Sequence, residues 1–248
     1  MSAIISEIEA HARAALPALD TEIYDGWQLR FADGHTRRAN SVNFIGRSSL
    51  PLEEKISYCE AAYKQINQPC HFRLTPLADN NLDTELSNCG YSLSDPTDVL
   101  IQPLGDITFT QEATDAHIEK GVSVEGINAI GRLTGLSPKS QKTFRKMVGR
   151  SEQKLLLSTV NKGGKIVACG LGALSSDYLG LFEFATDPDY RRQGFAAAMV
   201  QGLLAEAASV GAKTAYLQAV QSNVDGINFW NDMGFKDCLY SYHYRSKL

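Results

Sequence analysis

Two arginines, a glycine and a run of small residues lie next to one another in the stretch DPDYRRQGFAAA, residues 187–198. Arg191 and Arg192 offer guanidinium donors, and the alanines after Gly194 are typical of the start of a helix. Guanidinium groups, free backbone amides and the helix dipole together form a site for anionic oxygens. On these residues alone, an ordinary strand-to-helix loop with two solvated arginines explains the pattern equally well.

A second group of polar side chains lies near the start of the chain, in the stretch WQLRFADGHTRRANS. An arginine pairs with a carboxylate through two parallel hydrogen bonds, so this predicted hairpin is suited to recognising an acidic group on an acceptor molecule. The alternative is that its arginines bridge two domains or are simply solvated. The candidate residues are Arg30, Arg37, Arg38 and Asn40.

The composition narrows the class of protein. The chain has 248 residues, 44% of them hydrophobic, which is enough for one large or two modest globular domains. Its formal net charge of −4 argues against nucleic acid or an anionic membrane as a partner. The first residues contain Glu7 and Glu9, unlike a signal peptide, and no apolar run approaches the roughly 18 residues of a membrane span.

Cysteine and histidine usage points the same way. The five cysteines contain no CxxC pair, and the five histidines are scattered without ligand spacing. Neither a disulfide framework nor a metal site is predicted from these spacings. We therefore expect a cytoplasmic protein with reduced cysteines.

The elements that must position the arginine loop are readable in residues 106–248. Alternating and 3.6-residue hydrophobic patterns, with turn residues between them, indicate strands and helices respectively. Ser137 and Asn223 are typical helix caps. The predicted order is helix, helix, three antiparallel strands, helix, strand, helix, strand, over 123–135, 137–149, 154–160, 165–174, 178–186, 195–210, 214–220, 223–230 and 233–245.

Residues 1–105 repeat part of this order more faintly. A strand hairpin, a helix, a strand, a helix and a closing strand follow one another, and the triplet at 89–91, Cys-Gly-Tyr, stands where Met-Gly-Phe stands at 233–235. The arginine loop has no counterpart, because Glu53 and Glu54 occupy that place and carboxylates at a helix N-terminus repel phosphate. The sequence therefore predicts two related domains, 1–105 and 106–248, with one anion site per chain.

The C-terminal half resembles the GNAT superfamily of acyl-CoA-dependent N-acetyltransferases. The family's loop pattern, Arg or Gln, two variable residues, Gly, one variable residue and then Gly or Ala, is met by Arg191, Gly194 and Ala196. FATDPDY matches the strand and turn before that loop, and NVDGINFWNDMGF matches the later helix that ends in a Gly-aromatic pair. The resemblance covers 106–248 and implies a mixed α/β (α+β) fold of two GNAT-like domains in tandem, each a mostly antiparallel twisted sheet flanked by helices.

The resemblance also implies how acetyl-CoA binds. The backbone amides of the arginine loop would hold the pyrophosphate, and a glycine there lets the backbone approach without a Cβ. The pantetheine would lie along the preceding strand like an added strand, which requires an open strand edge. The residues implied to bind acetyl-CoA are Phe184, Ala185, Thr186, Arg191, Arg192, Gln193, Gly194, Phe195, Ala196, Ala197, Asn223 and Trp230.

Attack on a thioester needs a neutral amine, and Glu183, the one carboxylate on the strand before the loop, is the candidate general base. Strict strand alternation turns Glu183 away from the acceptor side, so it faces an acceptor only if a bulge shifts the phase. Trp230 occupies the slot where many family members have a tyrosine, and indole is not a practical acid. Gln218 stands where some members carry a carboxylate, and glutamine is not a base.

The sequence thus predicts an N-acetyltransferase that moves the acetyl group of acetyl-CoA to a primary amine of a small-molecule or peptide acceptor, by direct attack in a ternary complex. The alternative is a non-catalytic acyl-CoA-binding or sensing protein, favoured by Trp230 and Gln218.

Overall fold

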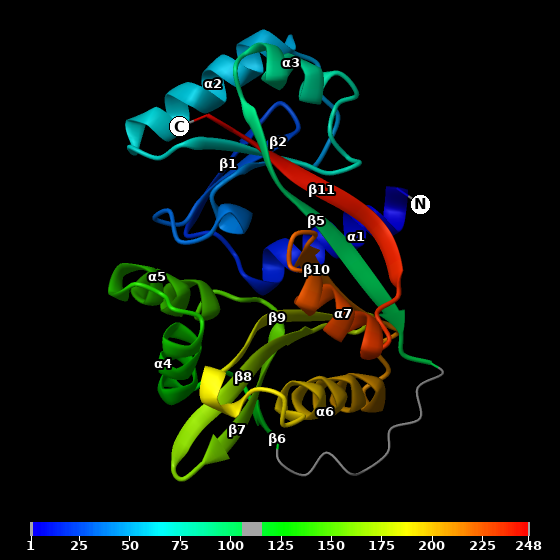
Figure 1. Ribbon diagram of the computed structural model, residues 1–248. Coiled ribbons are helices and arrows are strands. Elements are labelled where there is room, and N and C mark those ends of the chain that lie inside the picture. Colours follow the sequence, from blue (N-terminus) through cyan, green and yellow to red (C-terminus); the bar gives the residue numbers. More distant parts are fainter. Residues whose placement is uncertain (1, 106–115, 248) are drawn as a thin grey trace.

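The computed structural model describes residues 2–105 and 116–247 (Figure 1). The N-terminal part contains one helix before a strand hairpin and two more helices between its later strands. Its elements are α1 (Ser2–Ala15), β1 (Asp20–Tyr24), β2 (Trp27–Phe31), the 3-10 turn η1 (Arg37–Ala39), β3 (Val42–Phe44), α2 (Leu52–Gln65), β4 (Cys70–Leu74), α3 (Leu82–Asn88) and β5 (Ser92–Pro103).

The C-terminal part follows the predicted order of helices and strands from α4 onward, and begins with a strand, β6, that the sequence did not predict. Its elements are β6 (Ala116–Lys120), α4 (Val124–Leu133), α5 (Pro138–Val148), β7 (Lys154–Lys162), β8 (Lys165–Leu174), β9 (Tyr178–Thr186), the 3-10 turn η2 (Pro188–Tyr190), α6 (Phe195–Ser209), β10 (Thr214–Val220), α7 (Val224–Asp232) and β11 (Asp237–Lys247). The predicted caps are confirmed, because the side chains of Ser137 and Asn223 accept hydrogen bonds from the first turns of α5 and α7. The mixed α/β fold with two related units in tandem is confirmed.

The strands of both units join in one sheet, which has eleven strands within the described ranges. Their order is β1-β2-β3-β4-β11-β5-β10-β9-β8-β7-β6, so β11 lies between β4 and β5 while β5 lies between β11 and β10. The parallel neighbours among these strands are β3 with β4 and β9 with β10. The last strand of each unit therefore fills a place inside the sheet of the other unit.

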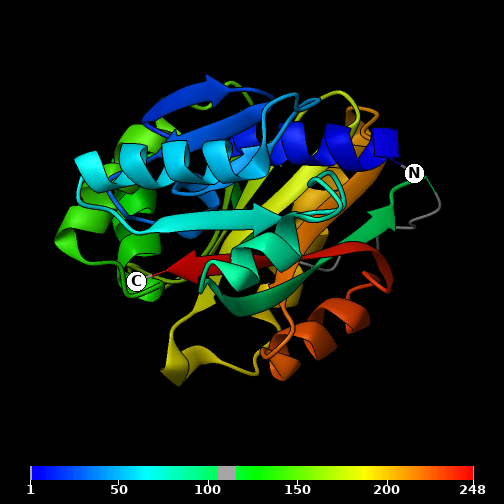
Figure 2. The same ribbon diagram turned by 90° about the horizontal axis from the view of Figure 1, so that it is seen from above.

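Helices cover the two faces of the C-terminal half of the sheet differently. Buried side chains of α1, α4 and α5 pack together with Phe182 and Tyr216 on one face, which we call the α1 face. Buried side chains of α6 pack with Leu181 and Leu217 on the opposite face, the α6 face, where α7 also lies. Figure 2 shows α1 (dark blue) and α7 (orange) on opposite sides of the strands. The prediction that the arginine loop binds CoA is therefore examined on the α6 face. The prediction that the hairpin arginines face an acceptor is examined on the α1 face.

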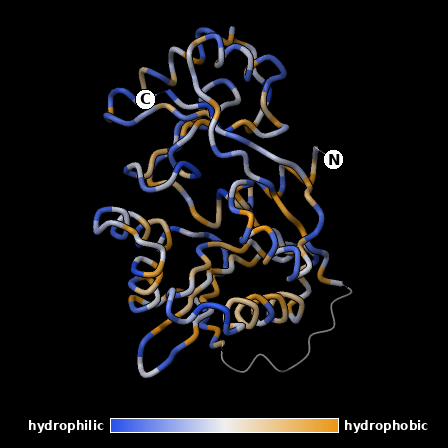
Figure 3. The backbone as a smooth tube through the Cα atoms, in the orientation of Figure 1, coloured by the Kyte–Doolittle hydropathy of each residue, from blue (hydrophilic) through white to orange (hydrophobic). Residues whose placement is uncertain are grey.

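Hydropathy follows this layering. Apolar residues concentrate in the strands of the C-terminal unit and in α6, whereas the outer turns are hydrophilic (Figure 3). A separate core of the N-terminal unit packs α2 and α3 against its strands around Trp27, Tyr63 and Phe72. Among the described residues, no helix has the length and apolar character that crossing a membrane requires.

Strands β9 and β10 separate partway along their length. They pair in parallel over Tyr178–Leu181 and Thr214–Leu217. Past Leu181, β9 keeps its pairing with β8 as far as Thr186, while β10 keeps its pairing with β5 as far as Val220. Within the described strands, the edge of β9 that faces β10 is thus unpaired from Phe182 onward. We call this opening the fork.

Candidate active site

A β-bulge reverses the phase of β9 at the fork. Glu183 has a φ of +54°, and the register between β8 and β9 shifts at this point. Phe182 packs on the α1 face, whereas the ring of Phe184 lies on the α6 face, 5.2 Å from the ring of Trp230. The extra residue leaves Phe182 and Glu183 on the same face. The bulge on which the role of Glu183 depended is therefore present.

Local sequence explains why the bulge is stable. A Cβ on Gly170, which lies across from the bulge on β8, would be 2.5 Å from Phe184 Cε1. Glycine at this position makes room for the ring of Phe184 over the sheet. The positive φ of Glu183 nevertheless costs about 1 to 3 kcal/mol, as at any non-glycine residue, and such backbone strain concentrates at functional sites.

The arginine loop leads into α6 with its backbone donors uncapped. Gly194 has a φ of +78°, and no side chain caps the N-terminus of α6. A Cβ built on Gly194 would meet no atom within 4 Å, so the space in front of this glycine is open. The Arg191 Nε donates to the carbonyl of Thr186 at 3.4 Å, which ties the loop to the end of β9. Open space and free amides suit an anionic ligand.

The corresponding loop of the N-terminal unit is filled by its own chain. Asp25 accepts hydrogen bonds from the backbone N–H of Ser49 at 2.8 Å and of Leu50 at 2.9 Å. The Nζ of Lys55, a fully buried side chain, lies 3.3 Å from the same carboxylate. Hydrogen bonds from this backbone, from the Ser49 hydroxyl and from Lys55 hold the pKa of Asp25 well below its usual value. An internal carboxylate thus occupies the place where the C-terminal unit keeps open space in front of Gly194.

The two predicted CoA contacts on α7 have structural partners in the protein. The Oδ1 of Asn223 accepts from the N–H of Gly226 at 3.1 Å and so caps the helix. Trp230 stands edge-on to Phe184, Phe229 and Phe235. Its indole supports Phe184 at the bulge from the α6 face.

On the α1 face, Glu183 meets the predicted acceptor hairpin. Its Oε1 lies 3.3 Å from an Nη2 donor of Arg38. The imidazole of His35 lies nearby, with its ring 5.7 Å from that of Phe144. Burial lowers the pKa of His35. The negative charge of Glu183 raises this pKa by a smaller amount, and the positive charge of Arg38 lowers it further. The hairpin of the N-terminal unit therefore reaches the fork of the C-terminal unit.

Three of the four hairpin candidates have internal partners, which differs from the expectation that they face an acceptor. Arg30 is buried and donates to the backbone carbonyls of Leu16, Arg13 and Arg38. Arg37 bonds to Ser94 and Asp95 of β5, which belong to its own unit. Asn40 accepts from the N–H groups of Ala32 and Gly34 and donates to the carbonyl of Thr36, so it fixes the hairpin turn. Arg38 contacts Glu183 of the C-terminal unit, so among the four candidates it makes the contact between units that the bridging alternative describes.

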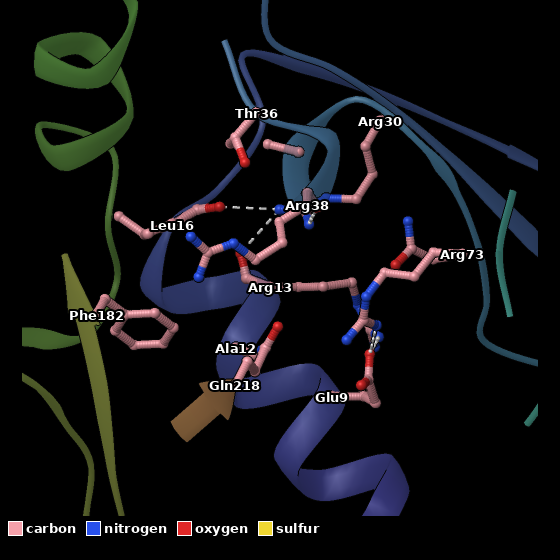
Figure 4. A pocket seen from close by; sticks show the side chains of 12 residues that line it. Glu9, Ala12, Arg13, Leu16, Arg30, Thr36, Arg38, Arg73, Phe182 and Gln218 are labelled. Atoms are coloured by element: carbon pink, nitrogen blue, oxygen red, sulfur yellow. Dashed lines mark hydrogen bonds and ion pairs between the residues drawn. The ribbon is translucent and has the colours of Figure 1, made fainter. Parts of the chain in front are cut away.

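A pocket opens beside the fork on the α1 face (Figure 4). Its lining includes side chains that the sequence did not single out, namely Glu9 and Arg13 of α1 and Arg73 of β4. Two signals in the sequence mark them: a charged residue inside the apolar strand CHFRL, and a Glu-Arg pair four residues apart on one helix. The described residues contain no group of three or more His, Cys, Asp or Glu side chains placed to hold a metal ion.

Comparisons with known proteins identify related chains. The model of the acetyltransferase (GNAT) family matches residues 130–235. The uncharacterized N-acetyltransferase YobR of Bacillus subtilis is 24% identical over 246 residues, 98% of either chain. The [ribosomal protein bS18]-alanine N-acetyltransferase of Escherichia coli K12 is 31% identical over 107 residues, which are 43% of this chain and 70% of that protein.

Two solved structures share the fold over most of the chain. A GCN5-related N-acetyltransferase from Kribbella flavida has a TM-score of 0.72 at 14% identity, over 98% of this chain and 95% of that one. A tandem GNAT protein from the clavulanic acid biosynthesis pathway has a TM-score of 0.66 at 7% identity, over 84% of this chain and 74% of that one. From the shared fold, the family match over the C-terminal unit and the 31% identical relative, we conclude that this chain belongs to the acetyltransferase (GNAT) family and is an acyltransferase.

Proposed function

We propose that the protein transfers the acetyl group of acetyl-CoA to a primary amine by direct attack within a ternary complex. The observation that carries this proposal is the bulge at the fork. It turns Glu183 toward the α1 face, while Phe184 and the uncapped N-terminus of α6 lie on the α6 face and the open edge of β9 lies between the two faces. The two reactants can then approach the fork from opposite faces.

The α6 face supplies the donor side. The amides of residues 192–197 and the dipole of α6 suit the pyrophosphate, with Arg191 and Arg192 as further cationic donors. The free edge of Ala185 and Thr186 offers backbone groups to the pantetheine, as a partner strand would. An N–H at this edge can polarise the thioester carbonyl, and one such donor is worth roughly 10² to 10³ in rate.

The α1 face supplies the proton acceptor. Glu183 takes one proton from the acceptor ammonium, so that the neutral nitrogen bonds to the acetyl carbonyl carbon and the C–S bond breaks. The second proton, which the nitrogen loses on becoming an amide, passes to the departing sulfur or to water. Coenzyme A leaves as a thiolate of pKa near ~8.5, which needs only modest help from an acid. Trp230 is packed against aromatic rings and donates no proton in this scheme.

The decisive variant is Glu183→Gln, which keeps the size of the side chain and removes the proton acceptor. We expect kcat/KM of acetyl transfer to fall roughly 10² to 10⁴-fold and the acidic limb of its pH profile to disappear. Release of free thiol from acetyl-CoA measures the rate, with small amines and peptides that have an N-terminal alanine as acceptors. The peptides are included because a relative is named for acetylating an alanine of a ribosomal protein.

The matched control is Glu152→Gln, at an exposed carboxylate away from the fork. Calorimetric titration of CoA into each protein separates binding from chemistry, and CoA affinity should be equal in both variants and the wild type. Retention of the rate and of the acidic limb in Glu183→Gln would remove Glu183 from the mechanism. Tight CoA binding without turnover of any amine would favour the binding or sensing alternative.

A further inference from the structure

The pocket beside the fork collects an excess of positive charge. Four arginines line it, each from a different element of the N-terminal unit (Figure 4). They are Arg13 of α1, Arg30 of β2, Arg38 of η1 and Arg73 of β4. The carboxylates in contact with this group are Glu9 and Glu183 among the described residues. Four cations against two anions leave a net charge of +2 on these six side chains.

Two of these arginines are fixed by the fold. Arg30 gives its donors to backbone carbonyls, which carry no formal charge and so leave its own charge uncompensated. Burial, followed by the charges of Arg13 and Arg73, lowers the pKa of Arg30 to about 10. Arg73 is 3% exposed and pairs with Glu9, yet its Nε has no hydrogen-bond partner among the described residues.

The other two arginines are freer to contact a ligand. The guanidinium of Arg13 lies 3.7 Å from Glu9, which is beyond hydrogen-bonding distance, and its side chain is 18% exposed. The side chain of Arg38 is 35% exposed, and its described side-chain hydrogen bond is the one to Glu183. Gln218 closes the pocket at the fork with an uncharged amide, whose Oε1 accepts from the hydroxyl of Tyr242.

Uncompensated charge in a partly dehydrated pocket is costly unless an anion completes it. We propose that this pocket binds a carboxylate of the acceptor, and that the acceptor is a small amino acid-like molecule with its amine a few bonds from that carboxylate. The short spacing follows from the 3.3 Å contact between Arg38 and Glu183, because one arginine borders both the anion subsite and the proposed base. This inference rests on the proposed function, and it explains what the unit without an open CoA loop contributes.

The test compares free amino acids with their carboxamides, which keep the amine and lose the negative charge. With wild-type protein we expect kcat/KM to be roughly 10 to 100-fold higher for the free acids, since hydrogen bonds to charged groups are the stronger ones. Equal or better turnover of carboxamides, or of peptide N-termini whose carboxylate is remote, would overturn the proposal.

The informative variant is Arg13→Gln, because Arg13 lines the pocket and contacts neither Glu183 nor the arginine loop. We expect the KM of free amino acids to rise about tenfold or more, with kcat and the KM of carboxamides little changed. Arg13→Lys should restore part of the affinity. The matched control Arg47→Gln changes an exposed arginine of the same unit and should leave both KM values as they are. Equal loss for acids and carboxamides in Arg13→Gln would assign Arg13 to the fold alone.

A binding measurement separates this inference from the proposed function. Amino acids and their carboxamides are added to protein saturated with CoA, and the melting temperature is recorded. A larger rise with the free acids, abolished in Arg13→Gln, supports the subsite even if no amine is acetylated. No difference between acids and carboxamides would overturn the subsite, whatever the fate of the acetyltransferase reaction.

Discussion

At the scale of single residues, Gly194 and Asp25 account for the difference between the two related units. Both units have a loop before a helix whose backbone amides suit an anion. In the N-terminal unit the carboxylate of Asp25 fills that place, whereas Gly194 leaves it open. The sequence predicted one anion site from the glutamates of the first loop, but it did not predict Asp25, which lies 24 residues before Ser49.

Replacing Gly194 with valine tests the open loop. A side chain there occupies the space proposed for the pyrophosphate, and we expect CoA affinity to fall at least 100-fold by calorimetric titration. The positive φ adds a cost of about 1 kcal/mol to folding, so the melting temperature should drop slightly. The control is Gly211→Val at the opposite end of α6, where φ is +86° and a Cβ likewise meets no atom within 4 Å. Equal CoA affinity in the two variants would show that the loop does not bind CoA.

At the scale of elements, the sequence predicted strands and helices well because each depends on local patterns. Ser137 and Asn223 cap their helices as expected, and the hydrophobic face of α6 is buried. The sequence could name a bulge at Glu183 only as a condition for its role as the base. Alternation within one strand does not reveal where the register with a neighbouring strand shifts. Arg30 and Arg38 of the pocket were among the predicted candidates, whereas Arg13 and Arg73 were missed, because α1 and β4 meet the fork only through the folding of the whole chain.

The bulge itself can be tested on the strand opposite it. In Gly170→Ala the new methyl group enters the place of the Phe184 ring, and we expect Phe184 to leave its position beside Trp230. Loss of this packing should destabilise the protein by about 1 to 3 kcal/mol in urea denaturation and lower kcat through misplacement of Glu183. Gly105→Ala, just after β5, where φ is not in the left-handed region and a Cβ meets no atom within 4 Å, controls for the general effect of a glycine substitution. Full activity of Gly170→Ala would show that the bulge does not depend on this glycine.

At the scale of the whole molecule, the two units are interleaved. β4 and β5 of the N-terminal unit are separated by β11, and β10 and β11 of the C-terminal unit are separated by β5. Each unit alone would keep a gap one strand wide, which only the closing strand of the other unit fills. The sequence predicted the repeat but not this interleaving, because strand order across a sheet is a long-range property. We therefore propose that the boundary at residue 105 separates two repeats that do not fold independently.

The last prediction follows from these gaps. Residues 1–105 and 106–248, produced separately, each lack a central strand and would expose unpaired backbone and apolar side chains along it. We expect each half to be unfolded or aggregated by circular dichroism and size-exclusion chromatography. Production of both halves together should restore a complex with the melting behaviour and CoA affinity of the intact chain, because β5 and β11 can then pair as they do within it. A folded 106–248 that binds CoA as tightly as the intact chain would show that β5 is dispensable. The contribution of the N-terminal unit would then be limited to binding the acceptor, through the hairpin that places Arg38 beside Glu183.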